Sequence, residues 1–384
     1  MDPSKFTAQK TGQLVPTSTV PGVTHAFVPA PLPPDWQWPQ SLWPLLLQAH
    51  RELAALDGIG RYLPNPQLLL SPLQNREAQR SSSLEGTVTD PQQQALFDVD
   101  PRYPRSKEDP ANAHREVFNY GRALRHRLEN QEQLPLSLRL IRALHGVLMD
   151  GVRGADQNPG HFRRVQNQVG RPARYVPPPV NELPACLDAF EKYLHSEHKF
   201  DPLVEAFLVH YQFEAIHPFG DGNGRVGRLL LALTIAEWCE LSNQWLYMSA
   251  YFDKNKDSYI DLMFRVSTHG DWQSWIEFCL RGVIEQASDT KRRCQRLQDL
   301  NREFHEKLKA IRGSVRLSAI VDELFETPVA IVTHVRRKHG VTYPTARSDL
   351  HKLESAGLLK KLEGVGQIAY YCPPIYDITF EDGV

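Results

Sequence analysis

The sequence predicts a mainly α-helical protein with short β-hairpins, and three features of the 384-residue chain point to this fold class. Apolar residues recur at helical spacing in most segments between residues 39 and 311. Two stretches with period-two character, residues 159–179 and 358–371, predict short hairpins instead. With 41% hydrophobic and 23% charged residues, the chain is long enough to bury a sizeable core and to form two or three domains.

The overall composition argues against several classes of protein. The formal net charge is −1, so no global field attracts the chain to nucleic acid or to a membrane. The five cysteines are odd in number and far apart, with no CxxC pair, which indicates a reducing compartment and argues against a structural metal. The chain has no apolar run of about 18 residues, and its N-terminus lacks the apolar region of a signal peptide. We therefore expect a cytoplasmic protein without membrane contact.

The N-terminal part begins with an extended segment and continues with two helices. Residues 1–34 are rich in proline, which forbids a helix and favours a segment laid over the surface. Residues 39–56 have helical apolar spacing, and Asp57 with Gly58 predicts that this helix stops there. A second helix is expected at about residues 65–82.

Two further helices and a hairpin come next. Residues 112–128 and 136–149 are amphipathic and predict helices with their large apolar side chains turned inward. Residues 159–170, followed by a proline-rich stretch at 175–179, predict a short hairpin with exposed edges. Such an edge can accept an extended peptide by strand addition, although a plain surface hairpin is the alternative.

Residues 217–228 read His-Pro-Phe-Gly-Asp-Gly-Asn-Gly-Arg-Val-Gly-Arg and connect two predicted core helices. The upstream helix spans residues 202–216, and the downstream helix should begin near Asn223 or Gly224. Gly222 and Gly224 lack a Cβ, so the chain can adopt positive φ and bring backbone N–H groups close to a ligand. Together with the helix N-terminus behind them, they predict a site suited to phosphate oxygens.

Four charged or titratable side chains of this loop extend the same chemistry. Arg225 and Arg228 lie three residues apart, and their guanidinium groups could hold oxygens farther along a polyphosphate. Asp221 is a hard oxygen ligand for Mg²⁺, and His217 is suited to accept a proton near neutral pH. An ordinary turn between two helices is the alternative, but a plain turn has no need for two arginines and three glycines in this register.

Downstream of the loop, residues 254–264 and 272–286 are expected to be helical. Residues 287–311 are strongly charged but keep their large apolar residues three and four positions apart. This last segment is predicted to be a connecting or self-associating helix.

The C-terminal residues 312–384 have a different character. Three short helices and a hairpin are expected at residues 317–325, 330–338, 343–356 and 358–371, the hairpin turning at residues 363–366. This order resembles a winged helix-turn-helix with the third helix as the recognition helix. Arg347, Lys352, Lys360 and Lys361 could reach DNA phosphates, but acidic and basic residues are nearly balanced over the whole segment. DNA contact and protein or dimer contact therefore both stay open.

The loop at residues 217–228 resembles the full signature of the Fic family, His-Pro-Phe-x-(Asp or Glu)-Gly-Asn-Gly-Arg-x-x-Arg, with every specified position matched. The resemblance implies a helical enzyme core that transfers the AMP part of ATP to a hydroxyl of a protein, with pyrophosphate leaving. It also implies roles for single residues. The base would be His217, the Mg²⁺ ligand Asp221, the phosphate cradle Gly222, Asn223 and Gly224, and the clamps on the outer phosphates Arg225 and Arg228.

A second stretch, Ser81-x-x-x-Glu85-Gly86, is by itself a helix cap and turn. It also resembles the inhibitory motif of the Fic subclass that carries its inhibitor N-terminal to the core, and the region before it resembles the N-terminal region that accompanies many Fic domains. In that subclass the glutamate reaches the last arginine of the signature, here Arg228, and occupies the space of the ATP γ-phosphate.

The resemblance adds two weaker assignments. The hairpin before the signature would be the family's flap, which aligns target residues by main-chain pairing, here around Val169 and Gly170. Tyr259 is the residue we place nearest the adenine, although an aromatic residue at helical spacing is more often part of a core.

The sequence therefore predicts a mainly α protein with a Fic helical core, a short β-hairpin flap and a small winged helix-turn-helix domain. The expected divisions are an N-terminal region with the inhibitory motif (1–105), the Fic core (106–286), a connecting helix (287–311) and the winged-helix domain (312–384). The main hypothesis is an autoinhibited, Mg²⁺-dependent protein adenylyltransferase that uses ATP to modify a target protein or itself, with homodimer formation and DNA as further partners.

Three alternatives remain at this stage. The enzyme could transfer another phosphate-linked group such as UMP or phosphocholine, or it could remove AMP with Glu85 positioning a water. The chain could instead be a DNA-binding regulator whose Fic core only senses nucleotide. Intact His217, Asp221 and both arginines favour catalysis, because a sensor does not need a base.

Overall fold

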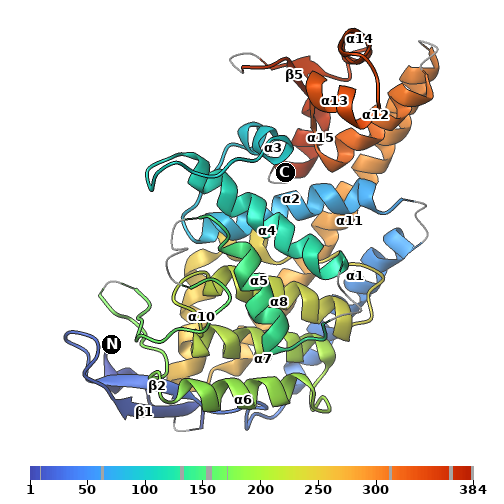
Figure 1. Ribbon diagram of the computed structural model, residues 1–384. Helices are drawn as coiled ribbons and strands as arrows, with labels where there is room; N and C mark the ends of the chain where they lie inside the picture. Colours follow the sequence, from blue (N-terminus) through green and yellow to red (C-terminus); the bar gives the residue numbers. More distant parts are fainter. Residues whose placement is uncertain are drawn as a thin grey trace.

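Helices build most of the protein, which confirms the predicted fold class (Figure 1). The computed structural model describes residues 1–8, 10–61, 65–129, 134–152, 158–170, 172–310, 314–362 and 366–381. The helices are α1 (Trp43–Arg61), α2 (Gln67–Leu84), α3 (Pro91–Val99), α4 (Ala111–Glu129), α5 (Leu138–Leu148), α6 (Leu183–Leu194), α7 (Pro202–Ile216), α8 (Asn223–Trp238), α9 (Ser249–Lys254), α10 (Lys256–His269), α11 (Trp272–Ala310), α12 (Val315–Glu326), α13 (Val332–Lys338), α14 (Tyr343–Ser355) and α15 (Pro373–Phe380). The strands are β1 (Gly12–Pro16), β2 (His25–Pro29), β3 (Val329–Ile331), β4 (Lys360–Lys361) and β5 (Ala369–Tyr371).

Helices α7 and α8 lie at the centre and pack against each other. Nearly every residue of α7 is buried, as its all-round apolar sequence requires. Its start is fixed by Asp201, whose carboxylate accepts the Leu203 N–H at 2.9 Å, and by Pro202 in the first turn. Its end is His217, which adopts the left-handed conformation. The loop at residues 217–222 is thus held between two buried helices, as predicted.

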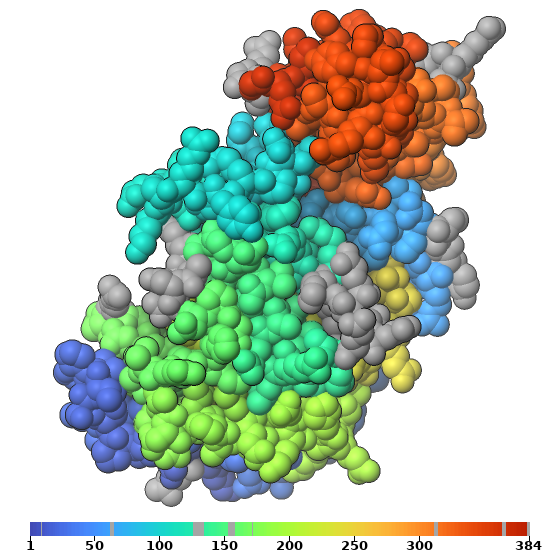
Figure 2. Space-filling model, in the orientation of Figure 1, coloured from blue at the N-terminus to red at the C-terminus, as the bar shows by residue number. Residues whose placement is uncertain are grey.

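Helix α2 lies between this core and the C-terminal elements (Figure 1). It contacts α4 and α9 on the core side, and α12 and α15 on the other. Figure 2 shows the C-terminal elements, in orange and red, gathered at one end of the molecule next to the segments that contain α2 and α3. Residues 81–86 at the end of α2 therefore have neighbours from both parts of the chain.

The N-terminal segment is extended, as predicted, and forms an antiparallel hairpin of β1 and β2 with Gly12 opposite Pro29. Phe27 is buried, and its N–H donates to the carbonyl of Val176 at 2.9 Å. The proline-rich start of the chain thus covers the segment that follows the predicted flap.

Three predictions about elements were wrong. Helix α1 does not stop at Asp57 but continues to Arg61, because the Asp57 carboxylate accepts the Ser242 N–H at 2.7 Å and pairs with Arg61 at 2.9 Å. Residues 287–310 are not a separate connecting helix, since α11 runs unbroken over 39 residues. Helices α3, α6, α9 and α15 were not predicted at all.

The predicted hairpin at residues 159–179 is also not a regular hairpin. Within its described residues, the strand pairing is limited to one isolated antiparallel bridge between Val169 and Tyr175. The rest of the segment packs against the loop through single hydrogen bonds, such as Arg163 N–H to Pro218 O at 2.9 Å. Irregular backbone of this kind cannot be inferred from period-two spacing.

The C-terminal part contains α12, α13 and α14 with a three-stranded antiparallel sheet in the order β3-β5-β4. Strand β3 occupies the start of the segment predicted as helix 330–338, and α13 begins only at Val332. Most of the predicted turn at residues 363–366 lies outside the described residues. Helix α15 returns to α11, where buried Arg293 donates to the carbonyl of Glu381 at 2.7 Å.

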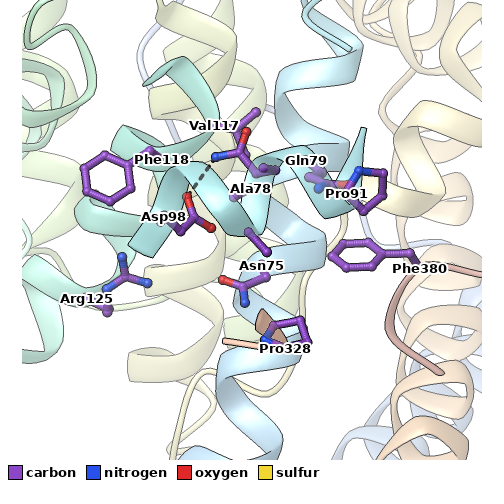
Figure 3. Close-up of a pocket in the computed structure, with 13 residues that line it drawn as sticks. Asn75, Ala78, Gln79, Pro91, Asp98, Val117, Phe118, Arg125, Pro328 and Phe380 are labelled. Atoms are coloured by element: carbon purple, nitrogen blue, oxygen red, sulfur yellow. Dashed lines mark hydrogen bonds between the residues drawn. The ribbon is translucent and has the colours of Figure 1, made fainter. Parts of the chain in front are cut away.

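A cavity lies where the C-terminal elements meet α2, α3 and α4 (Figure 3). Figure 3 shows Asn75 of α2, Asp98 of α3 and Phe380 of α15 turned toward one another there. The Asp98 carboxylate accepts a hydrogen bond from Gln94 at 2.8 Å, and burial raises its pKa to about 6. None of the lining residues belongs to the loop at 217–228, so this junction is separate from the site described below.

No helix in the described parts of the chain combines the length and the apolar character that a membrane span requires.

Candidate active site

The loop between α7 and α8 is shaped by its own side chains. His217 and Gly222 both have positive φ, at 51° and 76°. The Asn223 side chain holds Phe219 from both sides, because its Oδ1 accepts the Phe219 N–H at 2.8 Å and its Nδ2 donates to the Phe219 carbonyl at 2.9 Å. Asn223 therefore fixes the loop, whereas its predicted role was in the phosphate cradle.

His145 of α5 supports the same loop from outside. Its ring stacks on Phe219 with centroids 3.8 Å apart. Its Nδ1 accepts the Gly160 N–H at 2.8 Å, so its Nε2 carries the hydrogen and donates to the Asp221 carbonyl at 3.1 Å. Burial lowers the pKa of His145 to about 4, which keeps this tautomer neutral near pH 7.

His217 presents an unprotonated ring nitrogen. Its Nδ1 lies 3.3 Å from the backbone carbonyl of Glu214, an acceptor, so Nδ1 bears the hydrogen and Nε2 has the lone pair. Burial lowers the pKa of His217 to about 4. Its backbone is held by Arg163, whose Nε donates to the His217 carbonyl at 2.9 Å. A neutral histidine with a free lone pair is the state that a general base requires.

The N-terminus of α8 faces the same space. In the described chain no side chain caps this helix end, whose Ncap residue is Gly222. The amides of the first turn and the positive end of the helix dipole together favour an anion here. The loop thus has the backbone cradle that its glycines predicted.

Arg228 is buried in the first turns of α8 and points at α2. Its Nε donates to Ser81 Oγ, and its Nη2 donates to the Ser81 carbonyl and to Glu85 Oε1, all at 2.8 Å. A Cβ on residue 224 would lie 2.2 Å from Glu85 Oε1, so glycine at this position leaves the space that the carboxylate fills. The predicted contact between the motif Ser81 to Gly86 and Arg228 is present in the structure.

The Glu85 carboxylate is ionised in this pair. Burial would raise its pKa, but Arg228, with smaller help from Arg225, holds the pKa of Glu85 below its usual value. Gly86 ends the turn after α2 with φ of 85°, and its N–H donates to Ser83 O at 2.8 Å. A residue with a side chain would be strained at this φ, which explains the glycine of the motif.

Arg225 is held by an acid from another helix. Its Nη1 lies 3.4 Å from Glu116 Oε2, which also accepts a hydrogen bond from Thr87 at 2.6 Å. Its Nη2 lies 3.9 Å from Asp221 Oδ1. Both arginines of the loop are therefore buried cations whose anionic neighbours come partly from outside the loop.

Asp221 is the exposed acid of the loop. Its side chain is 52% exposed, and its Oδ1 accepts the Gly222 N–H at 2.6 Å. Among the described residues, no group of three or more His, Cys, Asp or Glu side chains could hold a metal ion by itself. A metal at Asp221 would need its remaining ligands from bound phosphates and water.

A mostly apolar pocket adjoins His217 and Glu214. Its wall is formed by the predicted flap, α7 and α10, through Val169, Arg174, Tyr175, Tyr211, Ala215, Ile260, Met263, Phe264 and Ser267. Burial raises the pKa of Glu214 to about 7, and within the described chain its Oε1 has no hydrogen-bond partner. The pocket has the size class and character of a site for a flat apolar group with one polar anchor.

Tyr259 does not line this pocket. It is 4% exposed, stacks on Phe252 with centroids 4.3 Å apart, and its hydroxyl lies 2.8 Å from His210 Nε2. His210 Nδ1 in turn donates to the Gly227 carbonyl at 3.1 Å, so Nε2 accepts from Tyr259. Tyr259 is a core residue that orients His210, and this position gives no support to the predicted adenine contact.

The flap residues have unequal accessibility for main-chain pairing. The N–H of Val169 donates to Tyr175 O at 2.8 Å, and its carbonyl accepts from Arg174 and Tyr175. Gly170 has φ of 84° and follows directly. Pairing with an added strand would therefore fall to Gly170, while Val169 contributes its side chain to the pocket.

Sequence reasoning missed four residues of the site: His145, Arg163, Glu116 and Glu214. Three of them come from helices or segments before the loop, and only the tertiary packing brings them to it. Glu214 offered a local signal, since it is the one acidic residue within an otherwise apolar helix turn next to His217.

Comparisons with known proteins agree with this geometry. Residues 135–235 match the Fic/DOC family model, and residues 43–129 match the model of the Fic/DOC family N-terminal region. Curated relatives called "Protein adenylyltransferase Fic" are 39% identical in Drosophila virilis and 36% identical in Drosophila melanogaster over 102 residues, which is 26% of this chain. The match spans only 20% of the length of these relatives.

Solved structures share the fold. A Fic family protein from Desulfovibrio desulfuricans G20 aligns with a TM-score of 0.55 and 18% identity over 89% of this chain and 98% of that chain. A Fic-1 fragment from C. elegans aligns with a TM-score of 0.51 and 18% identity over 65% of this chain and 72% of that chain.

Proposed function

We propose that this chain, which contains a Fic/DOC domain and a Fic/DOC N-terminal region, is an autoinhibited protein adenylyltransferase. It transfers AMP from ATP to a hydroxyl side chain of a target protein or of itself, and pyrophosphate leaves. The observation that supports this most is the juxtaposition of an unprotonated His217 Nε2 with the anion cradle at the N-terminus of α8. The adenylyltransferase relatives support the same reaction class.

The proposed step needs one base and several anion-binding groups. The target hydroxyl oxygen forms a bond to the α-phosphorus, the bond from that phosphorus to the pyrophosphate oxygen breaks, and the hydroxyl proton passes to His217 Nε2. The first-turn amides of α8 bind the phosphates, and Arg225 with Arg228 neutralises their outer oxygens. The apolar pocket beside His217 receives the nucleobase, and Gly170 aligns the target segment by main-chain pairing.

Asp221 is suited to Mg²⁺ because it is a single, half-exposed carboxylate beside the phosphate cradle. Mg²⁺ is commonly held by one or two carboxylates together with substrate phosphates and water. When bound, it would neutralise phosphate charge. We expect Asp221→Asn to raise the Mg²⁺ concentration needed for half-maximal transfer at least about tenfold, because one anionic ligand is lost. Titration of label transfer against Mg²⁺ checks this, and a curve identical to wild type would remove Asp221 from the metal site.

Autoinhibition follows from the contact between Glu85 and Arg228. The carboxylate occupies the guanidinium that an outer phosphate would need, at 2.8 Å, and Ser81 takes the other donors of the same side chain. ATP then competes with an anion that is already in place. In-line geometry is most of what phosphoryl-type transfer needs from the protein, so a nucleotide displaced by Glu85 reacts slowly.

The proposal extends to the wider setting of the protein. We place its work in the cytoplasm, with target proteins, self-modification and a homodimer as its interactions. The uninterrupted α11 joins residues 287–310 to the Fic core, so the C-terminal domain begins after this helix. Transfer of another phosphate-linked group and removal of AMP are the competing activities.

One experiment separates these activities. The purified chain and its Glu85→Gly variant are incubated with Mg²⁺ and α-labelled ATP, CTP, GTP or UTP, and label on protein is read after electrophoresis. We expect label from ATP, more strongly in the variant. Label from UTP or CTP alone would assign a different transferred group, and loss of AMP from pre-labelled protein that requires Glu85 would assign the reverse reaction.

A further inference from the structure

The C-terminal domain presents two helices and a strand ribbon on the side away from the Fic domain. Helices α13 and α14 are joined by residues 339–342, where Gly340 has φ of 63°, and they pack against each other. Thr342 caps α14 by accepting the Thr345 N–H at 3.3 Å. The domain docks on α2 and α11 through α12 and α15 instead, and Figure 1 shows α14 at the far end of the molecule.

Helix α14 has one buried and one open side. Ala346, Leu350 and Leu353 are buried in the domain core. Exposed residues occupy the other side: Tyr343, Arg347, Ser348, His351, Lys352 and Ser355. An amphipathic helix whose polar side carries two cations and an aromatic residue at its N-terminal end faces solvent here.

The charge of this region is strongly one-sided, although the whole chain has a formal net charge of −1. Residues 332–361 contain seven basic residues (Arg336, Arg337, Lys338, Arg347, Lys352, Lys360 and Lys361) against two acids (Asp349 and Glu354). Both acids already have cationic or titratable partners. Asp349 pairs with Arg316 at 2.6 Å, and Glu354 lies 3.0 Å from His351. The positive charges of α13, α14 and β4 are thus largely uncompensated within this region.

We propose that this surface, the basic face formed by Arg336, Arg337, Arg347, Lys352, Lys360 and Lys361, binds double-stranded DNA. Two packed helices followed by a two-stranded ribbon have the dimensions of a reader of the major groove. Helix α14 enters the groove with Tyr343 and Arg347 leading, and the lysines of β4 contact phosphates of the flanking backbone. The inference is independent of the proposed enzyme activity.

Edge protection and an acidic protein partner both account for less of the basic face. Lysines on the edge strand β4 would protect its free edge from pairing with another chain, but this does not explain the arginines of α13 and α14. An acidic protein partner would need only a local patch. Cations spread over two helices and a ribbon match a polyanion with charge along its whole length.

The test uses the full-length chain and a fluorescein-labelled duplex of random sequence about two helical turns long, with fluorescence anisotropy as the readout. We expect binding at low salt that weakens steeply as salt rises, because bound phosphates release counterions. The double variant Arg347→Ala with Lys352→Ala should weaken binding at least about tenfold and reduce the slope of log affinity against log salt by about 2.

The matched control removes two exposed cations from the Fic core, Lys192→Ala with Arg281→Ala, and should bind like wild type. A second variant, Lys360→Ala with Lys361→Ala, tests the ribbon and should also weaken binding. Absence of binding by the wild-type chain at low salt would overturn the proposal. So would an equal loss in the control pair, or competition by polyglutamate that is as effective per charge as unlabelled duplex, which would indicate an acidic protein partner.

Discussion

The loop at residues 217–228 is held by bonds from its own neighbourhood, whereas the end of α2 that faces it is held by elements far away in the chain. In the loop, Asn223 holds Phe219 at both backbone groups, and His145 fixes Asp221. At the end of α2, Lys256 of α10 donates to the Leu84 carbonyl at 2.6 Å. The catalytic geometry is therefore built in, while the group that blocks it can be displaced without rebuilding the loop.

The other side of α2 strengthens this contrast. Asn75 donates to the carbonyl of Glu326, just before β3, at 3.3 Å, and Tyr376 of α15 donates to the Pro91 carbonyl at 2.5 Å. The cavity of Figure 3 lies between these contacts. The C-terminal domain thus touches the helix that carries Glu85 but not the loop itself. Changes in the loop should act on chemistry, and changes around α2 should act on inhibition.

The largest expected effect is that of His217→Ala. In a Glu85→Gly background it should reduce label transfer by roughly 10²–10⁴-fold, because a general base contributes about this much. ATP binding should be nearly unchanged, since the ring contacts no phosphate in our proposal. Transfer is measured with α-labelled ATP and binding by calorimetry. The exposed His195→Ala is the control, and retained transfer in His217→Ala would exclude His217 as the base.

The next effect is that of Glu85→Gly alone. Removing the carboxylate frees Arg228 for an outer phosphate, and auto-transfer should rise at least about tenfold, or roughly 1.4 kcal/mol of barrier. Adding Arg228→Ala should abolish the gain, because the freed clamp is then missing. The control is Glu197→Gly, an exposed change of the same kind. Equal rates for Glu85→Gly and wild type at saturating ATP would show that Glu85 does not inhibit.

The contrast also explains what the sequence could predict. The bounds of α7 and the start of α8 were predicted within a residue or two, because local signals mark them: an Asp-Pro start, an apolar helix and a glycine-rich loop. The chemistry of residues 217–228 followed from the same stretch. Contacts made by α2 could be placed only through a motif, since nothing local in residues 81–86 indicates that Arg228 lies 2.8 Å away.

The remainder depended on tertiary packing. Helix α6 was missed although Leu187 and Phe190 have helical spacing, because the prolines before it and at its second position were taken as loop signals. His145 and Glu116 are ordinary residues of amphipathic helices until α4 and α5 fold against the loop. Tyr259 was placed near the adenine for its aromatic ring, but packing against Phe252 puts it in the core.

A smaller effect is expected at the junction between α2 and the C-terminal domain. The double change Asn75→Ala with Tyr376→Phe removes two hydrogen bonds that do not touch the loop. Auto-transfer should rise by no more than about fivefold, corresponding to ~1 kcal/mol, since the position of α2 is loosened rather than lost. The same changes in the Glu85→Gly background should have no effect. A rise that persists there would mean that the junction acts on the loop directly.

The smallest expected effect is that of pH on the uninhibited enzyme. The pKa of His217 is lowered to about 4 by burial, so the neutral base persists as pH falls from 8 to about 5, well below the point where a free histidine gains its proton. In Glu85→Gly, kcat/KM measured at excess Mg²⁺ should therefore stay level over this range, because kcat/KM reports groups of the free enzyme. The wild-type chain should stay inhibited throughout, because Arg228 keeps the pKa of Glu85 below its usual value and the carboxylate ionised. A fall centred near pH 7 would point instead to Glu214, whose pKa burial raises to about 7. Glu214→Gln separates the two: loss of the fall assigns it to Glu214, whereas a fall that survives this change would mean that His217 titrates near its ordinary value and that its burial does not keep it neutral.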